Sequence, residues 1–156
     1  MRIPRPDWNP ADREKSLDEQ ASWLNSLARA AFEMDGKHPE MFFLVGEDGR
    51  IEGLQFRDGL PTEEKNSEIR SLAQRFAVFG TIHIRLETVY HPKLTGRPEA
   101  QGIQFLDGTS DYETNEKVCL LVEMESRNGT HRIWANPVLD DEGQLSLGDT
   151  LTAAMA

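Results

Sequence analysis

Two dipeptides that favour tight hairpin turns constrain the fold of this chain more than any other feature. They are Asp48-Gly49 and Asn128-Gly129, and each stands between two runs of apolar, strand-forming residues. The favoured two-residue hairpin loops need positive φ angles, which Asn, Asp and Gly adopt most readily. The sequence therefore predicts two antiparallel hairpins, with strands at 41–45 and 51–56 and at 118–124 and 132–139.

A first amphipathic helix is predicted at 17–34, where apolar residues recur every three or four positions. Ser16 and Glu19 have the spacing of a capping box, which would start this helix. Gly36 is placed to end the helix in the left-handed conformation.

A second amphipathic helix is predicted at 63–79, with Thr62 as its cap and Gly80 at its end. Because each helix has a single apolar stripe, we expect each of them to cover one face of a sheet. The side chains predicted to form the core are Leu24, Leu27, Phe42, Leu44, Leu72, Phe76, Ile84 and Leu120.

The segment 81–91 alternates apolar and polar residues, which predicts a strand with one wet face. The polar side chains on that face are His83, Arg85, Glu87 and His91. A long polar loop follows at 91–116, and loops of this length are usually functional or disordered. We expect this loop to be partly disordered.

These elements predict an α+β fold with a mainly antiparallel sheet of about five strands and two covering helices. The order α-β-β-α-β-(loop)-β-β resembles that of the roadblock/longin group and its profilin-like relatives, in element order only. We expect a Pro-rich N-terminal arm at 1–15, one α+β domain at 16–148 and a C-terminal tail at 149–156.

The charge balance narrows the classes of partner. The chain has 27 acidic and 17 basic side chains and a net charge of −10. This balance disfavours direct binding to nucleic acid or to an anionic membrane, which need clustered positive charge. It favours a protein partner, and the acidic charge suggests a basic one. Self-association into a homo-oligomer is left open. The single cysteine, Cys119, fits a cytoplasmic location.

Neither a metal nor a cofactor is predicted. His83 and His91 share one strand face, but eight residues of strand separate them by about 26 Å, which is too far for one ion. The acidic segment after Asp107 lacks the glutamate of a calcium loop, because Val118 occupies the twelfth position. We find no phosphate-binding loop and no nucleophile elbow in the sequence.

Two functional hypotheses follow. The first is a non-enzymatic, acidic protein-interaction module or regulatory or inhibitory binding protein, with Ile3, Trp8 and Trp134 as candidate partner-binding residues. The alternative is a small enzyme or enzyme subunit, with a polar site on the 81–91 strand under the 91–116 loop. His83, Arg85, Glu87 and His91 are the candidate catalytic residues of that site.

Overall fold

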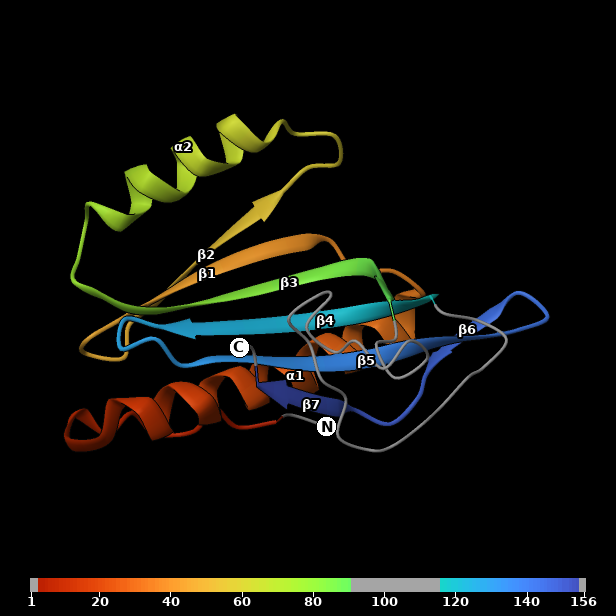
Figure 1. The fold of residues 1–156 in the computed structure, drawn as a ribbon, viewed down its shortest axis with the longest axis horizontal. Coiled ribbons are helices and arrows are strands. Elements are labelled where there is room, and N and C mark those ends of the chain that lie inside the picture. The colour runs from red at the N-terminus through yellow and green to blue at the C-terminus, as the bar shows by residue number, and fades with distance from the viewer. Residues whose placement is uncertain (1–2, 91–115, 155–156) are drawn as a thin grey trace.

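A curled antiparallel sheet and two helices form an α+β fold in the computed structural model, which describes residues 3–90 and 116–154 (Figure 1). The helices are α1 (Arg13–Asp35) and α2 (Thr62–Ala73), with a short 3-10 helix η1 (Pro10–Asp12) before α1. The strands are β1 (Glu40–Gly46), β2 (Ile51–Phe56), β3 (Val78–Tyr90), β4 (Glu116–Ser126), β5 (His131–Asp141), β6 (Gln144–Leu147) and β7 (Leu151–Ala154).

The two predicted hairpins are confirmed. β1 pairs antiparallel with β2, and β4 pairs antiparallel with β5. Gly49 and Gly129 have φ angles of 86° and 94° at the turns, but Asp48 and Asn128 do not have positive φ. Each turn is a three-residue loop that ends in the glycine, at 47–49 and 127–129, and not the predicted two-residue loop. The strand order is β2-β1-β3-β4-β5-β6, and β7 also pairs with β5, so the described residues form a sheet of seven strands rather than about five.

Helix α1 starts earlier than the capping box predicts. Asp12 is its N-cap, and the Asp12 side chain accepts a hydrogen bond from the backbone amide of Lys15. Ser16 lies inside the helix, where its hydroxyl accepts a hydrogen bond from the amide of Asn9. The C-terminal prediction is confirmed, because Gly36 caps the helix with a φ of 68°.

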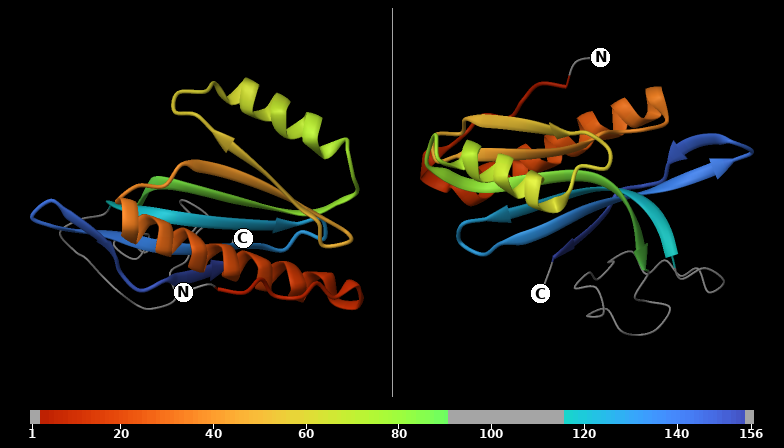
Figure 2. Two further views of the ribbon diagram at one scale, coloured as in Figure 1. Left: turned by 180° about the vertical axis from the view of Figure 1, so that it is seen from behind. Right: turned by 90° about the horizontal axis from the view of Figure 1, so that it is seen from above.

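The main core lies between α1 and one face of the sheet (Figure 2). The buried residues of α1 include Leu17, Ala21, Leu24, Ala28 and Phe32, and they pack with alternate residues of β3 and β4. Leu27, which was predicted to be buried, is 36% exposed because it lies beside this stripe rather than on it.

Helix α2 differs most from its prediction. It ends at Ala73 instead of residue 79. Its N-cap residue is Pro61, which makes no side-chain capping hydrogen bond, so Thr62 is not the cap. Among its residues only Leu72 is buried. The helix packs against β1 and β2 at the edge of the sheet and does not cover a whole face (Figure 1). The expected pair of covering helices is therefore wrong for α2.

Gly80 has a packing role instead of a helix-ending one. It lies within β3, and a Cβ atom there would approach the Leu17 side chain to 2.5 Å and the Glu125 carbonyl oxygen to 2.9 Å. Glycine at this position therefore lets α1 and β4 come close to β3. Phe76 follows α2 in the chain and is only half-buried, with the Arg50 guanidinium 4.7 Å from its ring centroid.

The described part of the N-terminal arm lies against its own domain. The Trp8 ring makes an edge contact with Phe79, and its indole nitrogen donates a hydrogen bond to the Glu47 carbonyl. The indole of Trp23 donates a hydrogen bond to the Ile3 carbonyl. These contacts attach the arm to the fold.

A buried polar cluster fastens the C-terminal segment to α1. Asn136, on β5, is fully buried and donates hydrogen bonds to the Asn25 side chain and to the Leu120 carbonyl. Its side-chain oxygen accepts hydrogen bonds from Arg29 and Thr150. The cluster thus links α1 with β4, β5 and the residues that lead into β7.

The 91–116 loop cannot be compared with its prediction, since residues 91–115 lie outside the described part of the chain, and Glu116 begins β4. Among the residues that are described, no helix is long and apolar enough to cross a membrane.

Candidate functional site

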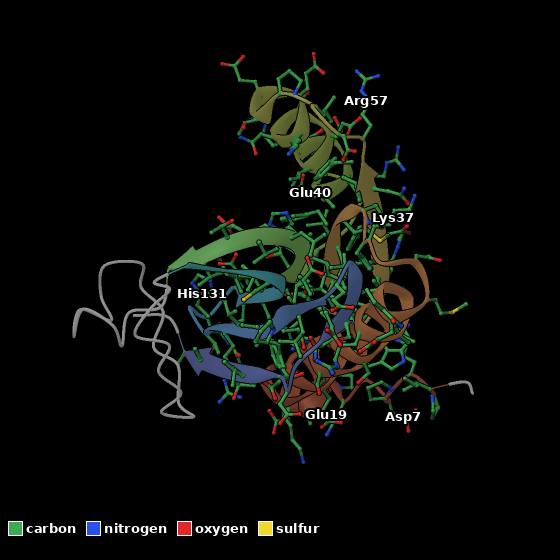
Figure 3. All side chains as sticks on the ribbon, turned by 90° about the vertical axis from the view of Figure 1, so that its right-hand side faces the viewer. Asp7, Glu19, Lys37, Glu40, Arg57 and His131 are labelled. Atoms are coloured by element: carbon green, nitrogen blue, oxygen red, sulfur yellow. The ribbon has the colours of Figure 1, made fainter. Side chains whose placement is uncertain are left out.

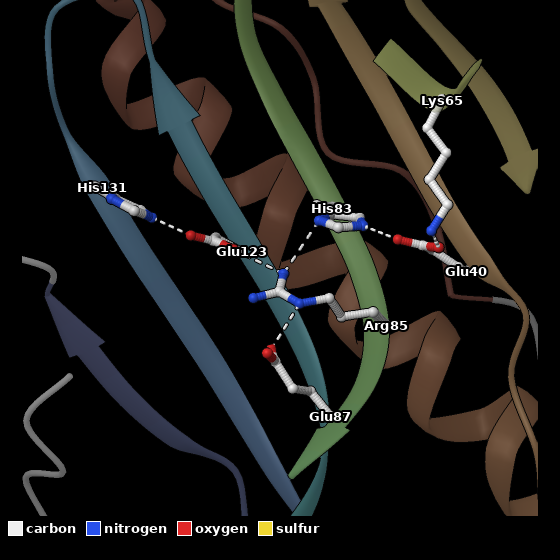
Figure 4. Close-up of polar contacts among 7 residues, drawn as sticks. All are labelled: Glu40, Lys65, His83, Arg85, Glu87, Glu123 and His131. Carbon is white, nitrogen blue, oxygen red and sulfur yellow. Dashed lines mark hydrogen bonds and ion pairs between the residues drawn. The ribbon is translucent and has the colours of Figure 1, made fainter. Parts of the chain in front are cut away.

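A chain of charged and imidazole side chains crosses the sheet face opposite α1, and we call it the polar row (Figure 4). Its members are Glu40, Lys65, His83, Arg85, Glu87, Glu123 and His131. They come from β1, α2, β3, β4 and β5. The cross-strand register places His83 opposite both Phe42 and Glu123, so alternate residues of four strands share this face.

One end of the row is a His–Glu–Lys arrangement. Nε2 of His83 lies 2.7 Å from Oε2 of Glu40, and Nζ of Lys65 lies 2.6 Å from the other carboxylate oxygen. Both oxygens of Glu40 are therefore engaged. About a quarter of each of these three side chains is exposed, so the contacts are partly shielded from water.

The tautomer of His83 follows from its second neighbour. Nη1 of Arg85 lies 3.1 Å from Nδ1 of His83. A guanidinium can only donate, so Nδ1 must accept, and Nε2 carries the proton donated to Glu40. Both ring nitrogens of neutral His83 are therefore occupied by hydrogen bonds. General acid–base catalysis by this histidine would require one of them to be released.

Arg85 is the centre of the row. It donates to Glu87 at 2.8 Å and to Glu123 at 2.7 Å, and thereby joins the two carboxylates. The other oxygen of Glu123 contacts Nε2 of His131, which also lies 3.3 Å from an oxygen of Glu125. The row contains no hydroxyl or thiol group, so it offers no serine, threonine or cysteine nucleophile.

The pKa values of Glu40, Glu123 and Arg85 shift in the directions that keep these residues charged. Burial raises the pKa of Glu40, but the hydrogen bonds from Lys65 and His83 outweigh burial and hold it below its ordinary value. Burial raises the pKa of Glu123 as well, and the hydrogen bond and charge of Arg85 outweigh it, so this pKa is also lowered. Burial lowers the pKa of Arg85, whereas the hydrogen bond and charge of Glu123 raise it, and the net shift is upward.

The pKa of His83 is lowered. Burial is the largest cause, and the positive charge of Arg85 adds to it, while the hydrogen bond to Glu40 opposes both. The folded protein therefore favours the neutral imidazole, in agreement with the tautomer that its two hydrogen bonds define.

Acidification from about pH 7.5 to about pH 5 is expected to lower the free energy of unfolding, in part through His83. The pKa of His83 in the unfolded chain is near 6.5 and in the folded state it is lower, so the unfolded state takes up the proton first. The stability contributed by neutral His83 is lost as the pH falls from 6.5 through the folded value. Glu40 acts only below this range, because its stabilisation is present above 4.5 and is lost as the pH falls from there through its lowered folded pKa.

Urea unfolding of the wild type and of His83→Gln at about pH 7.5, 6 and 5 tests this expectation. Glutamine retains a donor and an acceptor but does not titrate, so the variant should lose less stability than the wild type between pH 7.5 and 5. The variant's own stability at pH 7.5 is the control for any structural cost of the substitution. Equal pH dependence of the two proteins would contradict the assignment.

A hollow of about 370 Å³ lies beside the row, at the end of the sheet where β1 begins and β2 ends. Its lining residues are His38, Glu40, Asp58, Arg85, Leu86 and Glu87. Three carboxylates and one guanidinium therefore line it, and the guanidinium is already paired with Glu87 and Glu123. The hollow is acidic, and its volume falls within the range of ordinary ligand sites.

The predicted catalytic residues are partly brought together. His83, Arg85 and Glu87 share one face as the alternation of the strand predicts, whereas His91 lies outside the described residues. Sequence reasoning missed Glu40, Lys65, Glu123 and His131 as members of the row. A signal existed for Glu123, which interrupts the apolar run of β4, but no local pattern links it to His83.

The predicted partner-binding residues make contacts within the chain. Trp134 is buried in the main core, 6% exposed, and Trp8 packs beside that core. The backbone of Ile3 bonds to Trp23. A role of these residues in partner binding stays a prediction, and the acidic hollow is the more accessible candidate surface. Cys119 is buried, as its apolar run predicts.

Comparisons with known proteins supply no relative. The chain matches no protein-family model, no curated protein and no solved structure.

Proposed function

We propose that this protein is a non-enzymatic interaction module that binds a basic segment of another protein, in a regulatory or inhibitory role. The acidic hollow is the observation that carries the proposal. The ammonium group of Lys65 already pairs with Glu40, so Asp58 and Glu87 are the carboxylates that would meet the cationic side chains of a partner. Asp58 and Glu87 are the more exposed carboxylates of its lining.

Two further carboxylates follow Asp58 in the chain. Glu63 and Glu64 are exposed in the first turn of α2, a few residues after Asp58. A cleft lined by one sign of charge raises the local concentration and the association rate of an oppositely charged partner. Association of this kind weakens with salt, because ions screen the attraction.

The alternative function is a small enzyme whose site is the polar row. It has less support, since both nitrogens of His83 and both oxygens of Glu123 are already engaged within the row. The row suits a fixed display of charge better than proton transfer. The proposal also includes a cytoplasmic location. It further includes a fold related to the roadblock/longin or profilin-like group, which rests on element order only.

The test compares three immobilised baits of the full chain. The baits are the wild type, the double variant Asp58→Asn/Glu87→Gln, and the control double variant Asp7→Asn/Glu19→Gln. The control loses the same number of charges as the first variant. Figure 3 shows Asp7 and Glu19 on the side of the molecule away from Glu40, so the control leaves the hollow intact. Proteins from an extract of the source cells are captured at about 50 and 300 mM salt and compared between baits.

We expect a basic partner to be retained by the wild type and by the control pair at low salt, and to be lost from the Asp58/Glu87 variant. The higher salt concentration should release it from all three baits. Equal retention by both variants would place the interface elsewhere. If no partner is captured at low salt, and an activity that depends on His83 appears, the enzyme alternative replaces the proposal.

A further inference from the structure

The β4–β5 hairpin brings together three side chains that can bind a metal. Glu123 and Glu125 are two residues apart on β4 and therefore point to the same side of the strand. His131, the first residue of β5, is the direct cross-strand partner of Glu125. One ligand atom from each of the three residues lies within 4.8 Å of the others.

The geometry is close to what a tetrahedral metal needs. Oxygen and nitrogen ligands at bond lengths of about 2.0–2.1 Å are separated by about 3.3 Å around a tetrahedral zinc ion. The separation between Oε1 of Glu125 and Nε2 of His131 is 3.3 Å. The other contact, from His131 to Glu123, is closer and would open when an ion enters between them. Rotation of the more exposed Glu125 side chain can adjust the third ligand.

An outer contact already orients the least exposed ligand. Nη1 of Arg85 holds one oxygen of Glu123 at 2.7 Å, which directs the other oxygen toward His131. Carboxylates that bind metals are typically held in this way by a second hydrogen bond. The three carboxylates and two cations of the polar row, together with the carboxylate of Glu125, have a net charge of −2 before any charge on the histidines is counted. A divalent cation would neutralise that charge.

From this arrangement we infer a binding site for a first-row divalent transition metal such as Zn²⁺, formed by Glu123, Glu125 and His131. An imidazole with two carboxylates suits these metals better than Mg²⁺ or Ca²⁺, which prefer all-oxygen sites. Three protein ligands leave a fourth position for water or for a group of a partner. This site differs from the expectation that the chain binds no metal, which considered His83, His91 and the acidic segment after Asp107 but not this hairpin.

Calorimetric titration of ZnCl₂ into the full chain, after treatment with a chelator and dialysis, tests the site. We expect one zinc ion per chain. His131→Ala and Glu125→Gln should each weaken binding by at least about tenfold, since even the loss of an outer contact often has that effect. Glu19→Gln removes an exposed carboxylate of α1, outside the polar row and the triad, and His38→Ala removes a histidine elsewhere, so both should bind zinc like the wild type.

The Glu125→Gln variant keeps the test decisive if His131→Ala fails to fold, because the Glu125 side chain is 58% exposed. The absence of saturable zinc binding by the wild type would overturn the inference. Wild-type affinity in Glu125→Gln would overturn it as well. Loss of binding in His38→Ala alone would assign the zinc to a surface histidine outside the hairpin.

Discussion

Replacing Phe32 by alanine is expected to lower the free energy of unfolding by about 3–5 kcal/mol, the range for a large aromatic side chain removed from a packed core. Phe32 is 1% exposed and lies in the main core under α1. Its removal loses the transfer free energy of the ring and leaves a cavity that a rigid helix–sheet interface fills poorly. Urea unfolding followed by circular dichroism measures the change.

Met34→Ala is the matched control, because Met34 lies two residues away on the same helix and is 85% exposed. The control should change stability by less than about 0.5 kcal/mol. Phe76→Ala should cost less than Phe32→Ala, since Phe76 is only half-buried, although its apolar spacing predicted a core position. A loss below about 1 kcal/mol for Phe32→Ala would show that α1 does not pack on the sheet as described.

Replacing Asn136 by alanine is expected to lower the free energy of unfolding by about 2–6 kcal/mol. The estimate counts two buried acceptors that lose their donor, each costing roughly 1–3 kcal/mol. These acceptors are the side-chain oxygen of Asn25, at 2.8 Å, and the carbonyl of Leu120, at 2.9 Å. Arg29 and Thr150 also lose a common acceptor, so the segment before β7 is held less firmly.

The control for this substitution is Asn66→Ala on the exposed surface of α2, where a change within about 0.5 kcal/mol is expected. A double-mutant cycle with Asn25→Ala separates the contribution of the Asn25–Asn136 pair from the general loss of packing. Urea unfolding gives all four free energies. Additive effects of the two substitutions would contradict the direct hydrogen bond, because residues in one buried network are expected to couple.

Those features that depend on neighbouring residues could be predicted from the sequence. The two hairpins follow from Asp48-Gly49 and Asn128-Gly129, because positive φ angles at a turn are a local requirement. The end of α1 at Gly36 has the same kind of local cause. The common face of His83, Arg85 and Glu87 follows from strand alternation.

Errors arose where tertiary packing competes with a local pattern. In sequence Gly80 resembles the end of a helix, but it lies within β3. Glycine fits there because α1 and the backbone of β4 approach too closely for a side chain. The apolar residues at 69–76 predict a long covering helix, whereas α2 ends at Ala73 and packs at the edge of the sheet. An apolar stripe indicates which side of a helix is buried, but it does not specify which part of the sheet that side packs against.

Local sequence thus determined the hairpin turns, most of the helices and strands that define the α+β class, and the polar face of β3. Each of these depends on residues within a few positions of one another. Tertiary structure alone decided which polar residues meet. Glu40, Glu123 and His131 join His83 and Arg85 only through the order and register of β1, β3, β4 and β5. Register and strand order come from packing between distant segments, where a shift of one residue would turn every side chain of a strand to the opposite face.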